Sequence, residues 1–315
     1  MNFRTNIKLQ KERNQIDYNS KLVLIGSCFS ENISKKLHYF KFPTFSNPFG
    51  ILFNPIAIEN LITNAINLKK YSEKNTFSLN ERWHCFDAHS DISAITQNEL
   101  LLNLNSAIKQ THQQLKNASH IVITLGTAWV YRFIETDTIV GNCHKVPQKK
   151  FLKEMLSVDE ILASLQNTCV LIKDINPTAT IIFTVSPVRH LKDGFIENTQ
   201  SKAHLISAVH QIITTKNKLF YFPSFEIMLD DLRDYRFYSS DMMHPNETAI
   251  NYIWEQFKYV WIDEKTFATL KEVDTIQKGM AHRPFNSSST QHQQFLKTLH
   301  DKIALLEKTI PNIHF

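Results

Sequence analysis

The sequence predicts an α/β fold, namely a three-layer α/β/α sandwich with a mostly parallel sheet. Short apolar runs that stop at a glycine or a proline recur along the 315 residues, and such runs are typical of buried parallel strands. Between them lie longer segments whose apolar residues are spaced as on one face of a helix. Strands that alternate with helices predict a parallel sheet with helices on both faces.

Four strands are expected: LVLIG at 22–26, HIVITLG at 120–126, TIIFTVSP at 180–187 and KLFYFPSFEIM at 218–228. The first two runs stop at a glycine, and the third stops at a proline, which cannot donate a hydrogen bond to a neighbouring strand. A doubly covered sheet must bury its strands and the inner face of its first helix. The residues expected to be buried on this basis are Ile33, Leu37, Val122, Ile123, Ile182 and Phe183.

Helices are expected between the strands. The first carries Ile33, Leu37 and Phe40 on one face, with Ser30 as its N-cap. Further helices are expected at 56–70, at 158–175 and within PNETAINYIWEQF, which begins at residue 245. The segment 42–55 contains three prolines and one glycine, so it is expected to be an ordered loop.

The chain is expected to divide into a main domain, residues 1–260, and a helical C-terminal extension, residues 261–315. The last helix of the extension carries one apolar stripe, formed by Phe295, Leu299, Ile303, Leu306 and Ile310. We expect this stripe to pack on the main domain, and a partner helix is the alternative. The sequence leaves the oligomeric state open.

Composition argues against several classes of partner. The net charge is +5, but the basic residues are scattered and form no block with interleaved aromatics, which argues against nucleic-acid binding. The first residues lack the apolar core of a signal peptide, and no run is apolar enough to span a bilayer. We therefore expect a cytoplasmic protein without a membrane partner. Its cysteines are then expected to stay reduced: Cys28, Cys85, Cys143 and Cys169.

The turn after the first strand, GSCFS, is the first candidate site, because sites in parallel sheets form at the carboxyl ends of strands. A helix N-terminus there lowers the pKa of a thiol and can hold an oxyanion. Ser27 and Cys28 are both candidate nucleophiles. A phosphate loop would need a GxxxxGK[ST] pattern, which is absent. The alternative is a structural glycine turn with a buried cysteine.

The loop SSDMMHPNE, residues 239–247, is the second candidate site. Asp241 precedes His244 by three residues, just before a predicted helix. At this spacing a carboxylate can bind one imidazole nitrogen and leave the other free as a general base. The alternative is a surface loop whose histidine caps the helix.

Taken together, the two stretches resemble the motifs of a known superfamily. GSCFSEN is similar to the GDSLTEG-type motif of the SGNH (GDSL-type) hydrolases, with Gly26 on its glycine, Ser27 on its aspartate, Cys28 on its nucleophilic serine and Glu31 on its glutamate. DMMHPN resembles the DxxH block of that superfamily. The strings GSCF, GTAWVYR, NCHKVP, SPVRH and DMMHPN, in this order over roughly residues 20 to 260, resemble the GSCFA family, a relative of these hydrolases.

The resemblance has one departure besides the nucleophile. SGNH hydrolases carry an oxyanion-stabilising asparagine where this chain has Ala128, in GTAW. Removing one such donor costs about a hundredfold or more in rate. The candidate site therefore includes the backbone of Gly26, Gly126 and Thr127, and possible substitutes for the missing donor are Asn47, Asn54, Asn142 and the amide of Gly50.

Two further stretches, ERWHCFDAHS and GNCHKVP, place cysteine and histidine side by side. A structural zinc site needs four ligands at known spacings, and no C-x₂-C occurs, so no metal is expected. The functional interpretation is that Asp87, His89, His144 and Lys145 line a substrate pocket. The alternative is that His84 and His89 are hydrogen-bonded loop histidines.

The stretch SPVRH places Arg189 and His190 just after the third predicted strand. Arg189 is a candidate partner for an acidic substrate group, and His190 is a second candidate base. Surface ion pairs are the alternative for both residues.

The resemblance implies a hydrolase or acyltransferase that acts on an acyl ester of a small molecule or a carbohydrate. In that interpretation Cys28, or Ser27, attacks the carbonyl carbon, His244 transfers the proton, and Asp241 orients His244. No cofactor is expected. The alternative is a carbohydrate- or metabolite-binding protein on a degenerate hydrolase scaffold, which the missing asparagine and the cysteine favour.

Overall fold

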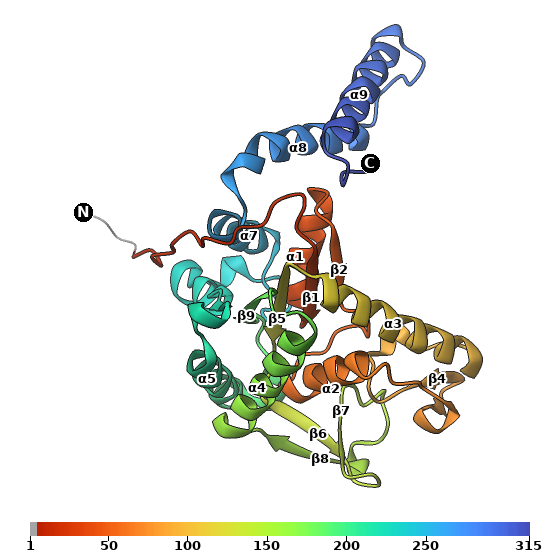
Figure 1. The fold of residues 1–315 in the computed structure, drawn as a ribbon, viewed down its shortest axis with the longest axis vertical. Helices are drawn as coiled ribbons and strands as arrows, with labels where there is room; N and C mark the ends of the chain where they lie inside the picture. The colour runs from red at the N-terminus through yellow and green to blue at the C-terminus, as the bar shows by residue number, and fades with distance from the viewer. Residues whose placement is uncertain (1–4) are drawn as a thin grey trace.

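Within residues 5–315, which this computed structural model describes, a parallel sheet of five strands forms the centre of the molecule (Figure 1). The strand order is β10-β9-β5-β1-β2, and every neighbouring pair is parallel. The strands are β1 (Leu22–Gly26), β2 (Thr44–Ser46), β5 (His120–Leu125), β9 (Thr180–Val185) and β10 (Leu219–Tyr221).

Alternate side chains of the strands enter two separate apolar cores. Val23, Ile123 and Phe183 pack with one set of helices, whereas Leu24 and Ile182 pack with the other set. The first set is α2 (Pro55–Ile66), α3 (Gln97–Asn117), α4 (Val158–Ile175) and α5 (Phe195–Ile212). The second set includes α1 (Cys28–Tyr39) and α7 (Glu247–Trp261). The predicted α/β architecture, with helices on both faces of a parallel sheet, is confirmed.

The six residues expected in the core are all buried. Val122 has the largest exposed fraction of the six, and it is only 4%. The predicted helix at 158–175 matches α4 residue for residue. Apolar periodicity was sufficient here because both the strands and the helices have wide apolar faces.

Three local predictions are wrong. Residues 44–46, expected in a loop, form edge strand β2, whose backbone pairs with β1 between the prolines. The run 218–228 is a strand only as far as Tyr221, because Pro223 precedes a short helix, α6 (Ser224–Glu226), and a π-helical turn, Ile227–Leu232. The N-cap of α1 is Ser27, and Ser30 instead lies inside the helix, where its hydroxyl donates to Thr124 Oγ1 at 2.7 Å.

Two small antiparallel sheets, which the sequence did not predict, flank the main sheet. Their strands are only three to five residues long, so the period-two pattern is too short to recognise. One is the hairpin of β3 (Phe77–Leu79) and β4 (Arg82–His84). The other has the order β7-β6-β8 and consists of β6 (Trp129–Phe133), β7 (Thr138–Val140) and β8 (Phe151–Met155).

The C-terminal extension consists of α8 (Phe267–Ala281) and α9 (Thr290–Thr309), which project from the main sheet (Figure 1). Leu299 and Leu306 of α9 are buried, and α9 packs on α8. The contacts with the main domain include a hydrogen bond from Tyr39 to Asp274 of α8 and one from Asn312, beyond α9, to Tyr18. The apolar stripe of α9 therefore packs on α8.

Candidate functional site

The loops that follow the three central strands meet at one edge of the sheet. The turn after β1 is held to β5 because the Ser27 N–H donates to the Thr124 carbonyl at 3.0 Å. The loop after β9 is held to the DMMH loop because the Arg189 N–H donates to the Met243 carbonyl at 3.1 Å. Segments that are far apart in the sequence, GSCF, GTAW, SPVRH and DMMH, are thus brought to one place.

The two candidate nucleophiles occupy different environments at the start of α1. Ser27 is 1% exposed, and its hydroxyl accepts the Phe29 N–H at 3.3 Å as the N-cap of the helix. Cys28 is the first residue of the helix and is partly exposed. The serine therefore has a structural task, and the thiol is the group that a substrate can reach.

The Cys28 thiol has a raised pKa. Burial raises it most, the Glu31 carboxylate raises it further, and the Lys202 ammonium and the backbone N–H groups of Cys28 and Phe29 lower it. The helix N-terminus was expected to lower the pKa of this thiol below its usual value. That expectation is wrong for the protein without substrate, because desolvation outweighs the helix end.

Asp241 and His244 form the pair that the sequence predicted. The Asp241 Oδ2 atom lies 2.6 Å from His244 Nδ1. The other carboxylate oxygen accepts the backbone N–H groups of Met243, at 2.9 Å, and His244, at 3.0 Å. These backbone bonds, with the imidazole, lower the pKa of Asp241 to about 2. The carboxylate therefore fixes Nδ1 as the protonated nitrogen and leaves Nε2 as the potential base.

The base and the thiol are not directly bonded. Among the described residues, no hydrogen bond joins the Cys28 sulfur to His244 or to another histidine, and His244 is about half exposed, at 47% of its side chain. Catalytic hydrogen bonds are often long before substrate binds. The proposed roles of Cys28 and His244 predict a separation of about 4 Å or less between the Cys28 sulfur and a His244 ring nitrogen, and this stays a prediction.

A buried lysine that the sequence analysis did not identify lies at the same edge. Lys202 of α5 is 1% exposed, and its Nζ donates to the Gly126 carbonyl at 2.6 Å and to the Ser186 carbonyl at 2.7 Å. Burial lowers the pKa of Lys202 to about 7. Its position between Asn198 and Leu205 on the apolar face of α5 was the available signal, since buried helix positions recur every three to four residues.

His190 reaches the same point from the loop after β9. Its Nε2 atom is buried without a hydrogen-bond partner among the described residues, and it would lie 3.3 Å from a Cβ atom placed on Gly126. Burial, followed by the charges of Lys202 and His244, lowers the pKa of His190 to about 3. His190 is therefore a neutral imidazole at physiological pH, and it is a poor candidate for the base.

Most of the predicted oxyanion donors are already used. The N–H groups of Gly126 and Thr127 both donate to the Phe53 carbonyl, at 2.7 and 3.1 Å, and the Gly50 N–H donates to Asn47 at 2.8 Å. These amides hold loops to the sheet, so the oxyanion role expected for them is not supported. Ala128, in the position of the missing asparagine, is fully buried.

The asparagines proposed as substitutes also have structural bonds. Asn47 accepts the Gly26 N–H at 2.9 Å and donates to Glu31 at 3.4 Å. Asn54 caps α2 through the Ala57 N–H at 2.8 Å. Asn142 Oδ1 accepts the His144 N–H at 2.8 Å. Each side-chain oxygen therefore stabilises a turn or a helix end.

The histidines of ERWHCFDAHS and GNCHKVP form a structural cluster with their loops. His144 is 4% exposed, its Nε2 lies 2.8 Å from the Cys85 carbonyl, and burial lowers its pKa to about 4. His84 lies 2.7 Å from the Ser93 hydroxyl. His84 is thus a hydrogen-bonded loop histidine, as the alternative had it, and His144 is held in the same way.

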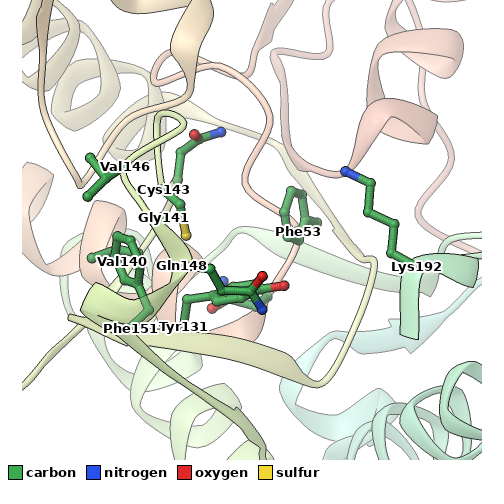
Figure 2. Close-up of a pocket in the computed structure, with 11 residues that line it drawn as sticks. Phe53, Tyr131, Val140, Gly141, Cys143, Val146, Gln148, Phe151 and Lys192 are labelled. Carbon is green, nitrogen blue, oxygen red and sulfur yellow. The ribbon is translucent and has the colours of Figure 1, made fainter. Parts of the chain in front are cut away.

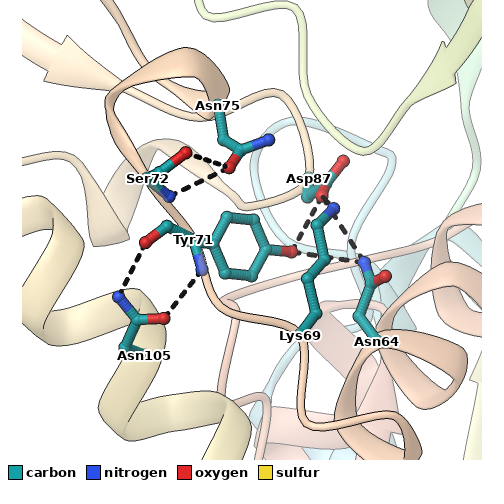
Figure 3. A network of polar contacts seen from close by, with 7 residues as sticks. All are labelled: Asn64, Lys69, Tyr71, Ser72, Asn75, Asp87 and Asn105. Carbon is teal, nitrogen blue, oxygen red and sulfur yellow. Dashed lines mark hydrogen bonds and ion pairs between the residues drawn. The ribbon is translucent and has the colours of Figure 1, made fainter.

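Asp87 anchors a second polar network in this region (Figure 3). Its Oδ2 accepts the Tyr71 hydroxyl at 2.8 Å and pairs with Lys69 at 3.0 Å, while Asn64 lies at 3.5 Å from the same oxygen. Through this oxygen the carboxylate joins the loop after α2 to the loop after β4.

A pocket of about 290 Å³ opens beside the edge (Figure 2). Phe53 separates it from the site, because its ring lies 5.8 Å from that of His190 and its Cβ lies 2.7 Å from a Cβ atom placed on Gly126. Tyr131 and Phe151 of the small sheet form an aromatic wall. Polar groups also line the pocket, namely Asn54, Asn142, Gln148 and Lys192.

Arg189 makes no ion pair among the described residues. Its guanidinium lies 4.2 Å from the Tyr238 ring centre and 5.2 Å from that of Tyr235, and its Nη1 atom is buried without a partner. The surface ion pair considered from the sequence is therefore absent in the described part of the chain. Arg189 retains an unused donor beside the DMMH loop.

Two protein-family models match the sequence of this chain. A model described as the GSCFA family matches residues 21–257, which cover all five strands of the main sheet. The chain belongs to the GSCFA family. A second model, described as the C-terminal domain of GSCFA domain proteins, matches residues 273–315. No curated protein matches this GSCFA protein.

The GSCFA chain offers no clear metal site in its described part, since no three histidine, cysteine, aspartate or glutamate side chains of residues 5–315 gather as ligands. Over the same residues, no helix combines the length and the apolar character needed to cross a membrane. Of the predicted site, the structure brings Cys28, Asp241, His244, Arg189 and His190 to one edge. It places Asn142 in the lining of the neighbouring pocket.

Proposed function

We propose that this GSCFA protein is an acyl-ester hydrolase or acyltransferase that uses Cys28 as nucleophile, His244 as base and Asp241 as the orienting carboxylate. The observation that carries the proposal is the Asp241–His244 pair, with its 2.6 Å bond and its two backbone bonds. The loop after β9 holds this pair at the edge of the sheet, because the Arg189 N–H donates to the Met243 carbonyl. A carboxylate fixed in this way has no need for a further partner. It serves to orient an imidazole.

In the proposed reaction, the Cys28 proton moves to His244 Nε2 while the sulfur attacks the carbonyl carbon of an acyl ester. The tetrahedral oxyanion collapses, and the alcohol leaves with the proton from His244. Water or a second alcohol then attacks the thioester and restores the thiol. The backbone N–H of Cys28 is near its own sulfur and is the oxyanion donor that the geometry supports best.

The pocket beside Phe53 supports a substrate with an apolar or ring-shaped part. The lining combines the aromatic rings of Tyr131 and Phe151 with the amide groups of Asn142 and Gln148, a composition suited to a carbohydrate or another small ester. We place the non-reacting part of the substrate in this pocket. A cytoplasmic location, inferred from the sequence, remains part of the proposal.

The second candidate function is binding without catalysis. It is favoured by the raised pKa of the Cys28 thiol and by the occupied amides of Gly126 and Gly50. In that case the same pocket would hold a carbohydrate or metabolite, and Cys28 would be a packing residue.

The test is brief iodoacetamide treatment followed by mass spectrometry and an assay with p-nitrophenyl and thioester acyl substrates. We expect Cys28 to be labelled before Cys143, and both before the buried Cys85 and Cys169, whose pKa values are raised to about 12. Turnover should fall in step with Cys28 labelling. His244→Ala should slow both, because the base is removed.

Two variants separate the alternatives. Cys28→Ala should abolish turnover, whereas Cys169→Ala, which removes a thiol of α4 that does not line the pocket, should retain it. Turnover that survives Cys28→Ala but not Ser27→Ala would transfer the role to Ser27. Equal labelling of Cys28 and Cys143, with no turnover of any short ester, would favour the binding protein.

A further inference from the structure

The charge on Lys202 needs an explanation that hydrogen bonding alone does not give. Lys202 is fully buried, and its Nζ bonds only two backbone carbonyls, those of Gly126 and Ser186. No carboxylate of the described residues pairs with it. A buried cation without a counterion costs several kcal/mol, whereas a neutral amide or hydroxyl would satisfy two carbonyls at a lower cost.

The location of the two carbonyls indicates what the charge serves. Gly126 follows β5 and Ser186 follows β9, so Lys202 joins the carboxyl ends of two adjacent strands. The next strand of the sheet is β1, and Cys28 follows it. The ammonium group thus lies on the protein side of the turn that presents the thiol.

We propose that Lys202 is an electrostatic positioning residue, which stabilises the thiolate of Cys28 from beneath the site. This inference rests on the proposed function, in which Cys28 is the nucleophile. Lys202 does not touch the substrate and acts through Cys28. When the thiol proton moves to His244, the sulfur becomes an anion, and the ammonium compensates that charge in a water-poor environment.

The charges around the thiol act in opposite directions. Glu31, on α1, raises the pKa of the thiol, so it opposes the thiolate. His190, on the loop after β9, lies close enough to Lys202 and to His244 for both charges to lower its pKa, and it is neutral. Lys202 is the one cation of the described residues that lowers the pKa of Cys28, and Cys28 is the one group that raises the pKa of Lys202.

The test measures the rate at which iodoacetamide alkylates Cys28 as a function of pH, in the full-length protein. Lys202→Met removes the charge at nearly constant length, and Lys202→Gln keeps two N–H donors for the carbonyls. We expect both variants to slow Cys28 labelling about tenfold at pH 6, where the wild-type Lys202 is mostly charged, and the difference from wild type to shrink above pH 8, where Lys202 is neutral. The urea midpoint of each variant shows that it is folded.

Lys173 offers a matched control. Its Nζ donates to the Ala179 carbonyl at 2.6 Å, just before β9 begins and therefore at the opposite end of that strand. Lys173→Met should leave the Cys28 profile unchanged. A Cys28 profile that is the same in wild type, Lys202→Met and Lys202→Gln would overturn the inference, even with Cys28 essential for turnover. Turnover that survives Cys28→Ala, with the Lys202 effect on labelling intact, would reject the proposed function and leave the charge coupling established.

Discussion

Asn47 should act on the site through the stability of the β1 turn rather than through chemistry. Its side-chain oxygen accepts the Gly26 N–H at 2.9 Å, one residue before Ser27, and its own backbone has a φ of 40°. Asn47→Ala leaves the Gly26 N–H without a partner, at a cost of about 1–3 kcal/mol. Alanine in the left-handed region adds about 1 kcal/mol. The free energy of unfolding should therefore fall by about 2–4 kcal/mol.

Two further variants separate these contributions in urea unfolding. Asn47→Gly relieves the backbone but loses the acceptor, so it should lose about 1 kcal/mol less than Asn47→Ala. Asn47→Asp keeps an acceptor and should be the mildest of the three, although its charge approaches Glu31, which Asn47 now contacts at 3.4 Å. A loss below about 0.5 kcal/mol in Asn47→Ala, or an equal loss in Asn47→Asp, would refute the structural role of this bond.

Two other outcomes follow from the structure. Gly26→Ala should cost about 3 kcal/mol or more in urea unfolding, because its Cβ would lie 2.1 Å from the Thr124 carbonyl oxygen and its φ is +139°; Gly279→Ala, whose Cβ meets only the flexible end of Leu299 at 2.9 Å, should stay within about 1 kcal/mol of wild type. His144 has a pKa of about 4 in the folded chain and 6.5 as its ordinary value, so the unfolded chain binds its proton first and stability falls as pH drops from 6.5 to 4. The loss in the free energy of unfolding is on the order of 3 kcal/mol. His144→Gln should reduce this loss when urea midpoints at pH 7 and 4.5 are compared. An equal loss in the wild type and in His144→Gln would contradict this account.

The sequence predicted the centre of the fold because the central strands have continuous apolar runs. β1, β5 and β9 are buried on both faces, so each reads as an unbroken run that ends near a glycine or a proline. Edge strand β2 was not predicted, because its residues are only partly buried and lie among prolines. The two small sheets were not predicted, because their strands have too few residues to show a period-two pattern.

The site was predictable only where its residues are adjacent in the sequence. The spacing of Asp241 and His244 places both on one turn, so their bond follows from local geometry. Lys202 belongs to the site through α5, and no local pattern relates it to Cys28. The occupied amides of Gly126 and Gly50 depend on where the loops at residues 47–53 cross the sheet, which a single sequence does not fix.

The charges at this edge determine the order of events in any reaction there. A thiol with a raised pKa is mostly protonated at neutral pH, so the resting site holds a thiol rather than a preformed thiolate–imidazolium pair. Asp241, with a pKa of about 2, is a carboxylate throughout the working range and favours the imidazolium once it forms. The proton must then leave Cys28 as the substrate binds and excludes water, when Lys202 has its largest effect on the sulfur. In such a GSCFA protein the free Cys28 thiol would react slowly with reagents in solution, and it would react much faster with a bound acyl ester.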